Sequence, residues 1–335
     1  MKVLVTGGSS LFGAGVAAAL AARGDEVVVQ QRSRSAPLDA MQVRQELGDI
    51  RDPDVVLAAA AGCDSIVHLA AKVGVVGSWD EYRSVNVDGT NNVIAAARRQ
   101  GIGRLVHVSS PSVAHGGEPI IGGGADAPVL GRTRAWYPES KAIAEIAALE
   151  AADADLAVVA IRPHLVWGPG DTQLVGRIVD RAASGRLALV GGGQALVDTT
   201  YIDNAISALV AALDAVEPGA RCSGRAYVVS NGEPRMIREL VAGICRAAGV
   251  PFAPRTVPLP VGRALGAAVE RTWPLLRRRD EPPLTQFLAE QLGTAHWFDP
   301  RPAEDDLGWR PSVSIDEGLA RLADWYESDR QLTAP

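Results

Sequence analysis

The most constraining feature of the sequence is a glycine-rich turn at the end of its first predicted strand. The segment Thr6–Gly13, TGGSSLFG, directly follows the apolar run Val3–Val5. Gly7 permits a tight turn, a small residue at Ser10 lets backbone approach a pyrophosphate, and Gly13 lets the next helix pack close to the sheet. Free N–H groups at the helix start attract phosphate. The turn therefore predicts a dinucleotide site formed by Gly7, Ser9, Ser10, Leu11, Phe12 and Gly13.

Short apolar runs alternate with helical segments through the first half of the chain. The predicted strands are Val3–Val5, Glu26–Val29, Ser65–Leu69, Leu105–Val108 and Ala157–Ile161. The predicted helices between them are Val16–Ala22, Val55–Ala61, Asn91–Arg99 and Ser140–Glu150. Continuous apolar strands separated by helices indicate a parallel sheet covered on both faces. We therefore expect an α/β fold with a Rossmann-like, doubly wound parallel sheet.

The composition of the sequence changes after Arg162 and Pro163, where glycine and proline become frequent. Helices without an obvious strand partner follow between Met236 and Trp297, and Gly122–Gly124 is predicted to be a mobile loop. Asp203 and Asn204 are expected to cap the helix that follows them. We expect a cofactor-binding domain of residues 1–165 with a return segment at 198–230. Residues 166–197 and 231–328 would form a smaller, mixed substrate-binding domain.

Composition narrows the classes of partner. The 335-residue chain is 47% hydrophobic and carries a net charge of −6, so it lacks the basic surface that nucleic-acid binding requires. The basic run Arg277–Arg279 is followed at once by acidic residues, as at a solvated helix end. Three cysteines and five histidines show no zinc-binding spacing, so no metal is expected. No apolar stretch approaches the roughly 20 residues of a membrane helix. We expect a cytoplasmic homodimer without a signal peptide.

The end of the second predicted strand bears on the choice of dinucleotide. NAD enzymes usually place a carboxylate there to bind the ribose hydroxyls, but this chain has Gln31, Arg32, Ser33 and Arg34. A guanidinium can instead hold a 2′-phosphate through charge-assisted hydrogen bonds. The pattern therefore favours NADP(H) over NAD(H). Farther along the chain, Asp49 and Ile50 are candidates to flank the adenine, and Leu69, Ala70 and Ala71 are candidates to line the cofactor groove.

The segment Tyr137–Lys141, YPESK, carries the predicted chemistry. Residues four apart lie on one face of a helix, so the phenol and the ammonium are neighbours. A nearby cation, together with a positive nicotinamide ring, is expected to lower the pKa of a phenol from its usual value of about 10. Ser110, at the end of a predicted strand, supplies a hydroxyl that could hold a carbonyl oxygen. We therefore predict an acid/base pair with a hydroxyl donor at the carboxyl edge of the sheet.

Taken together, these motifs resemble an extended short-chain dehydrogenase/reductase over essentially the whole chain. The matching segments are Thr6–Gly13, His68–Ala71, Asn86–Thr90, Ser110, Tyr137, Lys141 and Arg162–Pro163. The 3-beta-hydroxysteroid dehydrogenase branch is the most similar. Within it, bacterial 2-alkyl-3-oxoalkanoate reductases are particularly similar in Arg162–Asp171, Thr200–Asn204, Ser230–Pro234 and Glu281–Thr285. One departure is Ser10, where the family usually has glycine.

The resemblance implies Ser110, Tyr137 and Lys141 as the catalytic triad and NADP(H) as the cofactor. Further cofactor contacts are expected at Lys72, Asn86, Val108, Tyr137, Lys141, Pro163, Leu165 and Val166. Substrate contacts are expected at His115, Trp136, His164 and Trp167, whereas His68 and His107 should be packed within strands. The expected reaction is reversible reduction of a hydrophobic ketone, such as a 2-alkyl-3-oxo acid or a 3-oxosteroid, to a secondary alcohol. Two alternatives remain open: a sugar-nucleotide epimerase or dehydratase, and a non-catalytic NADP-sensing regulator.

Overall fold

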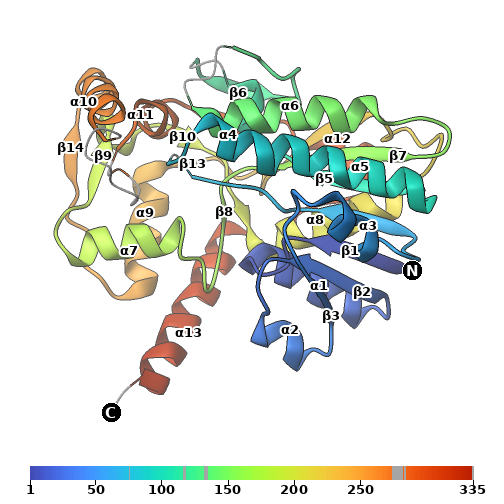
Figure 1. The fold of residues 1–335 in the computed structure, drawn as a ribbon. Coiled ribbons are helices and arrows are strands. Elements are labelled where there is room, and N and C mark those ends of the chain that lie inside the picture. Colours follow the sequence, from blue (N-terminus) through green and yellow to red (C-terminus); the bar gives the residue numbers. More distant parts are fainter. Residues whose placement is uncertain (75, 116–117, 132–134, 274–281, 283, 334–335) are drawn as a thin grey trace.

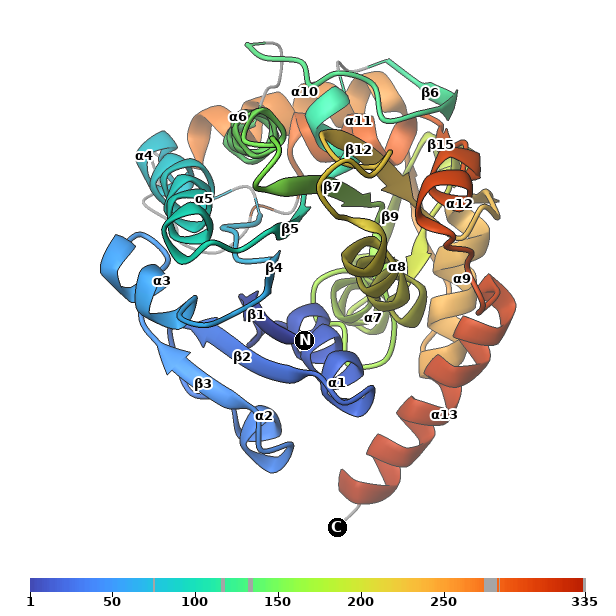
Figure 2. The same ribbon diagram turned by 90° about the vertical axis from the view of Figure 1, so that its right-hand side faces the viewer.

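Seven parallel strands form the central sheet, and helices cover both of its faces (Figures 1 and 2). The computed structural model describes residues 1–74, 76–115, 118–131, 135–273, 282 and 284–333. In spatial order the strands are β12 (Arg225–Val229), β7 (Ala157–Pro163), β5 (Arg104–Val108), β4 (Ser65–His68), β1 (Lys2–Thr6), β2 (Glu26–Gln31) and β3 (Arg44–Leu47). This order confirms the Rossmann-like, doubly wound sheet predicted from the sequence.

Alternate residues of each strand enter two separate cores. Val3 and Val5 of β1 pack with one helix layer, whereas Leu4 packs with the other. The first layer contains α1 (Leu11–Ala22), α8 (Ile202–Ala215) and α12 (Arg301–Leu307). The second contains α3 (Pro53–Ala59), α5 (Gly89–Gln100) and α6 (Trp136–Glu150). Because both strand faces are buried, the strands read as continuous apolar runs.

One segment far beyond β7 in the sequence returns to the central sheet. Strand β12 pairs in parallel with β7, with Arg225 opposite Val159 and Val229 opposite Pro163. Helix α8 packs against α1 and contributes Ala208 to the core beneath the sheet. The remaining short elements near the sheet are α2 (Ala36–Ala40), α4 (Trp79–Tyr82), the π-helix η1 (Arg83–Asp88) and the 3₁₀ helix η2 (Pro111–Ala114).

A smaller group of helices and short strands lies beside the carboxyl edge of the sheet (Figure 1). Its helices are α7 (Val175–Ala183), α9 (Ile237–Ala248), α10 (Leu259–Thr272), α11 (Gln286–Gly293), α13 (Ile315–Thr333) and the 3₁₀ helix η3 (Gly191–Gly193). Its strands form a mixed sheet of β13 (Arg235–Met236), β10 (Leu196–Val197), β15 (His296–Phe298) and β6 (Ile120–Gly123). Two parallel pairs complete it: β8 (Val166–Trp167) with β11 (Thr200–Tyr201), and β9 (Ala188–Val190) with β14 (Arg255–Val257).

The prediction of a loop at Gly122–Gly124 was partly wrong. Ile120–Gly123 forms strand β6, in which Ile120 pairs with His296 and Gly123 with Phe298. Glycine-rich sequence lacks strand propensity, and this strand exists because a remote segment pairs with it.

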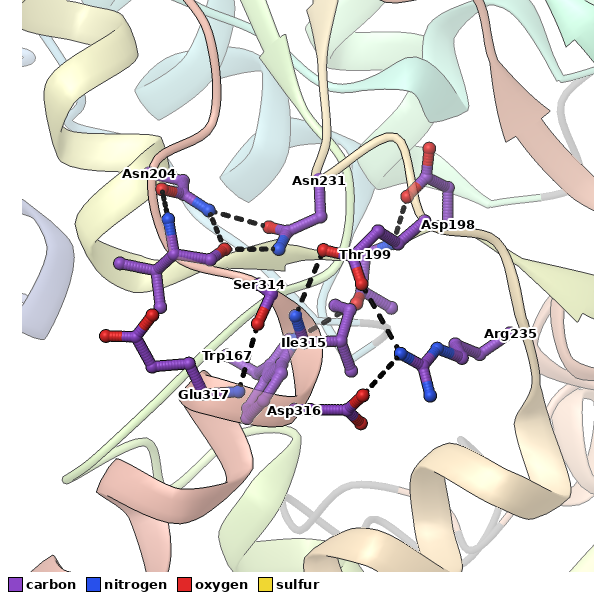
Figure 3. Close-up of polar contacts among 12 residues, drawn as sticks. Trp167, Asp198, Thr199, Asn204, Asn231, Arg235, Ser314, Ile315, Asp316 and Glu317 are labelled. Carbon is purple, nitrogen blue, oxygen red and sulfur yellow. Dashed lines mark hydrogen bonds and ion pairs between the residues drawn. The ribbon is translucent and has the colours of Figure 1, made fainter.

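A buried polar network joins α8, the segment after β12 and the segment before α13 (Figure 3). The Asn204 amide nitrogen donates to Asn231 Oδ1 at 3.0 Å and to the Val313 carbonyl at 2.7 Å. Its carbonyl oxygen accepts the backbone N–H groups of Ser312 and Val313. Asn204 was predicted to cap the helix that follows it. It lies instead inside α8, whose N-cap residue is Tyr201, and it fixes the C-terminal segment.

Two features of the sequence lie partly or wholly outside the described residues. These are the basic run Arg277–Arg279 and, within the Glu281–Thr285 motif, Glu281 and Pro283. In the described part of the chain, every helix is too short or too polar to cross a membrane.

Candidate active site

The turn between β1 and α1 is closely packed against the neighbouring chain. Gly7 has φ +76°, and a Cβ atom there would lie 2.8 Å from the backbone of Ala70. A Cβ atom at Gly13 would lie 2.4 Å from the Gly7 carbonyl oxygen. Ser10 caps α1: its hydroxyl accepts from the Gly13 N–H and donates to the Gly7 carbonyl, at 3.0 Å in each case. The serine that replaces the family's usual glycine thus closes the turn without filling it. The first N–H groups of α1 have no partner within the helix, which suits a bound pyrophosphate.

Two arginines lie just beyond the end of β2, and they differ in whether their side chains have partners. Gln31 is buried, whereas Arg32 and Ser33 are exposed just beyond it. Arg34 is already engaged, since its guanidinium bonds Asp39 at 2.8–2.9 Å. Arg32 makes no hydrogen bond or ion pair with the part of the chain that the structure describes. Arg32 is therefore the arginine available to an external phosphate.

The residues expected to flank the adenine lie at the end of the edge strand β3. Asp49 forms a two-point ion pair with Arg51 at 2.7–2.9 Å, and this pair lowers the pKa of the Asp49 carboxyl. Ile50 is buried. Of the two residues expected to flank the adenine, Asp49 and Ile50, only Asp49 has a partly exposed side chain.

The segment after β4 is fixed by Asn86 of η1. Its amide accepts from the Lys72 N–H at 2.7 Å and donates to the Lys72 carbonyl at 3.0 Å. It also donates to Ser140 Oγ of α6 at 2.8 Å. Asn86 therefore ties Lys72, the last residue of the segment Leu69–Lys72, to the helix that carries Tyr137 and Lys141.

His68 and His107 are fully buried in adjacent strands, as predicted. The His68 ring nitrogens bond Thr6 and Thr90 at 2.7 and 3.0 Å. His107 packs against His68 with ring centroids 5.4 Å apart. Burial lowers the pKa of His68 to about 3 and that of His107 well below its ordinary range. Both rings are neutral parts of the floor beneath the site.

Tyr137 and Ser110 meet at the carboxyl edge of the sheet. Tyr137 is half-buried in the first turn of α6, and Ser110 directly follows β5 as the N-cap of η2. The Ser110 hydroxyl contacts Ser112 Oγ at 2.9 Å. Burial raises the pKa of Tyr137, and a hydrogen bond with Ser110 partly offsets this rise. A phenol and a hydroxyl side by side can both donate to one carbonyl oxygen.

Lys141 is buried one helical turn beyond Tyr137. Its Nζ donates to the Val108 carbonyl oxygen at 2.6 Å, at the end of β5. Burial lowers the pKa of Lys141 to about 8, and the charge of Glu145 acts in the opposite direction. The sequence predicted that the ammonium would lower the pKa of the phenol. Desolvation by burial instead raises the pKa of Tyr137, and the group that opposes this rise is the Ser110 hydroxyl.

The segment after β7 contains a strained residue. Leu165 has φ +44°, a left-handed conformation that non-glycine residues seldom adopt. Its side chain packs against a buried cluster of the smaller group of elements, which includes Leu187, Leu189 and Val197. Pro163, Leu165 and Val166 lie where the chain leaves the sheet next to β5, the strand that Ser110 follows. Strain of this kind is common at binding sites.

The four expected substrate contacts have different surroundings. Trp136 is 51% exposed next to Tyr137 and packs against Trp79 with ring centroids 5.6 Å apart. His115 and His164 are buried, and both neighbour His296. Trp167 has no exposed surface: it packs against Tyr201 and donates to Thr199 Oγ1 at 2.9 Å. This environment favours a packing role for Trp167 over contact with substrate.

A buried ion pair next to the lysine was not predicted. Arg162 of β7 and Glu145 of α6 bond through two nitrogen–oxygen contacts at 2.8 and 2.5 Å. The available signal was the position of Glu145, four residues after Lys141, which continues the spacing of Tyr137 and Lys141. The sequence does not reveal that the partner is Arg162, since that follows from how α6 crosses the sheet.

The chain is similar to known proteins over most of its length. Residues 4–261 match the family described as the 3-beta hydroxysteroid dehydrogenase/isomerase family. The 2-alkyl-3-oxoalkanoate reductase of Stenotrophomonas maltophilia strain K279a is 52% identical, covering 96% of this chain and 98% of that protein. The 3-beta-hydroxysteroid dehydrogenase of Mycolicibacterium neoaurum is 32% identical, covering 97% and 91%.

Solved structures show the same fold. MoeE5 in complex with UDP-glucose and NAD has a TM-score of 0.76 and 25% identity, over 99% of this chain and 100% of that chain.

Proposed function

Because this chain belongs to the 3-beta hydroxysteroid dehydrogenase/isomerase family of oxidoreductases, we propose that it reduces a hydrophobic ketone to a secondary alcohol with NADP(H). The observation that carries the proposal is the placement of Ser110 and Tyr137 beside each other, with Lys141 one turn farther along α6. A non-catalytic cofactor sensor would not need this arrangement of proton donors.

In the proposed mechanism, the side chains act on the carbonyl oxygen of the substrate. Bound NADPH supplies the hydride that adds to the carbonyl carbon. Ser110 and Tyr137 donate hydrogen bonds to the oxygen, and Tyr137 then gives up its proton to it. The raised pKa of Tyr137 keeps the phenol protonated at neutral pH, as a proton donor must be. Lys141 stabilises the phenolate that remains until solvent returns the proton.

The proposed preference for NADP(H) is supported by residues at the carboxyl ends of β1 and β2. The glycine turn fits a dinucleotide, since Cβ atoms at Gly7 and Gly13 would collide with backbone that must stay close there. At β2, the unengaged Arg32 supports recognition of a 2′-phosphate, and we therefore propose NADP(H) over NAD(H). We also retain the division into a cofactor domain of residues 1–165 with 198–230 and a substrate domain, and assembly as a homodimer, as predictions.

The proposed substrate is a 2-alkyl-3-oxo acid, with a 3-oxosteroid as the second choice. The 52% identical relative is named for the first class, and the 32% identical relative for the second. The exposed Trp136, braced by Trp79 next to the predicted acid, supports an apolar entrance suited to an alkyl arm.

The decisive experiment replaces the phenol of Tyr137. Tyr137→Phe should lower ketone turnover at least about 100-fold while NADPH affinity changes little, because only the proton donor is removed. Loss of NADPH absorbance with ketone measures turnover, and fluorescence titration measures affinity. Tyr227→Phe is the matched control, since Tyr227 on β12 bonds Asp306 outside the site. Near-normal turnover in Tyr137→Phe would contradict the mechanism.

A homologous series of ketones tests the substrate class. Each buried methylene contributes about 0.8 kcal/mol, so kcat/KM should rise as the alkyl arms lengthen. Only part of this gain should appear in kcat, because uniform binding lowers KM without raising kcat. A flat or falling series would refute an apolar pocket, and activity confined to UDP-sugars would favour the epimerase alternative.

A further inference from the structure

The ion pair of Glu145 and Arg162 is among the most deeply buried charges of the described chain. The side chains are 0% and 1% exposed. Arg162 Nε donates to Glu145 Oε2 at 2.8 Å, and Nη2 donates to Oε1 at 2.5 Å. The third guanidinium nitrogen, Nη1, donates to the Asp126 carbonyl oxygen at 2.8 Å. The carboxylate is therefore held in one orientation.

The pair connects the two elements that would have to stay in register during the reaction. Tyr137, Lys141 and Glu145 recur every four residues, so they share the face of α6 that is turned toward the sheet. Arg162 stands on β7 immediately before Pro163 and the strained Leu165. Glu145 and Arg162 thus tie the helix of the proton donor to the segment that would face the nicotinamide.

A buried ion pair needs a reason beyond stability. Well-packed apolar residues are often at least as stabilising in such a place, because both charges lose their hydration. Burial also disfavours the charged form of Lys141, one turn from Glu145, since desolvation lowers its pKa to about 8. Its other titratable neighbours are Tyr137, whose raised pKa keeps the phenol protonated, and the buried, neutral His68 of β4 and His107 of β5. The carboxylate of Glu145 is the charge that opposes this desolvation.

We propose that Glu145 and Arg162 are positioning residues for the reaction: the Glu145 carboxylate stabilises the Lys141 ammonium, and Arg162 anchors that carboxylate to the end of β7. The consequence for catalysis rests on the proposed role of Lys141. The electrostatic link between Glu145 and Lys141 does not, and it can be measured without substrate.

The lysine content of the chain makes this measurement direct. The sequence contains three lysines, at positions 2, 72 and 141. NMR of protein labelled with ¹³C at lysine Cε should therefore give three side-chain signals, which Lys2→Arg and Lys72→Arg would assign. A pH titration of the remaining signal reports the pKa of Lys141.

Two single substitutions should move this pKa in opposite directions. Glu145→Gln removes the negative neighbour and leaves Arg162 charged, so the pKa of Lys141 should fall by at least about one unit. Arg162→Met leaves the carboxylate unpaired, so the pKa should rise. A purely structural pair would behave differently, because loosening admits water and raises the pKa in both variants. Unchanged or raised values in Glu145→Gln would overturn the proposal.

A charge-neutral double variant guards against loss of folding. Glu145→Gln combined with Arg162→Met removes both members of the ion pair, so neither is left buried without the other, and the protein should fold and still show a lowered pKa at Lys141. Asp153→Asn is the control, since it breaks the exposed pair with Arg98 at 2.8 Å near the end of the same helix. It should leave the Lys141 titration unchanged. If the pKa of Lys141 in the double variant equals that of the parent protein, Glu145 is not the charge that stabilises the ammonium.

Kinetics then test the consequence for catalysis. The alkaline limb of kcat for ketone reduction should shift to lower pH in the double variant, and kcat at pH 8 should fall at least about 10-fold with KM little changed. A parental pH profile together with a shifted Lys141 titration would show that the electrostatic link exists but that turnover does not depend on it. Absence of ketone reduction by the parent protein would instead refute the proposed function, whatever the titration shows.

Discussion

Replacing Arg32 tests how the chain chooses between two dinucleotides that differ by one phosphate. A charge-assisted hydrogen bond contributes about 1.5–3 kcal/mol where solvent is excluded. Arg32 is exposed at the end of β2, so screening by water should reduce its contribution to about 1–2 kcal/mol. Arg32→Ala should therefore weaken NADPH binding by a factor of about 5–30. NADH lacks the phosphate, and its affinity should change less than about twofold.

Arg34 provides the matched control because it has the same side chain two residues away. Its guanidinium is already paired with Asp39 at 2.8–2.9 Å, so Arg34→Ala should leave the NADPH/NADH ratio near that of the parent. Fluorescence titration with both cofactors at low and high salt measures the ratio, and the Arg32 effect should shrink as salt rises. Equal losses of NADPH and NADH affinity in Arg32→Ala, or the larger effect in Arg34→Ala, would refute the assignment.

Two further predictions concern stability. Asn204→Ala leaves the backbone N–H groups of Ser312 and Val313 without their acceptor, and that of Val313 is buried, at about 1–3 kcal/mol for a buried group. It also removes two buried hydrogen bonds, to Asn231 and to the Val313 carbonyl. Urea unfolding should show a loss of about 2–5 kcal/mol, whereas Asn92→Ala, which removes one bond to Ile50, should cost less than about 1.5 kcal/mol. Burial lowers the pKa of His68 and His296 to about 3 and of His164 to about 4, from 6.5, so stability should be lost as pH falls below 6.5. Asp198, with its pKa raised to about 6, acts in the opposite direction but is one group against three. A free energy of unfolding that stays constant from pH 7 to 5 would contradict this.

The sequence predicted the central sheet because its signals are local. Each inner strand is a continuous apolar run next to a helical segment, and both strand faces are buried. The glycine turn could also be predicted from local sequence. Its glycines are required there, since a Cβ atom at position 7 or 13 would collide with nearby backbone. Ser110, Tyr137 and Lys141 were predicted from their spacing and from their positions at strand and helix ends.

The features that were missed depend on distant partners. Strand β6 contains two glycines and forms because His296–Phe298 pairs with it. The short edge strand β3, with the polar sequence RQEL, lacks the apolar pattern of the inner strands. Asn204 looked like a cap because it lies near a helix start, and only the fold shows that residues 312 and 313 meet its amide. Long-range polar contacts leave no periodic trace in the sequence.

The charges at the site bear on the direction of the reaction. The Tyr137 phenol is protonated at neutral pH, because burial raises its pKa and Ser110 offsets this only in part. Lys141, with a pKa of about 8, is still mostly charged at pH 7. A protonated phenol beside an ammonium can donate a proton at once, as ketone reduction requires. Alcohol oxidation needs the phenolate instead, and a positively charged nicotinamide would favour that form. Reduction should therefore predominate near neutral pH, whereas oxidation should gain as pH rises toward the pKa of the phenol, until deprotonation of Lys141 removes the charge that supports the phenolate.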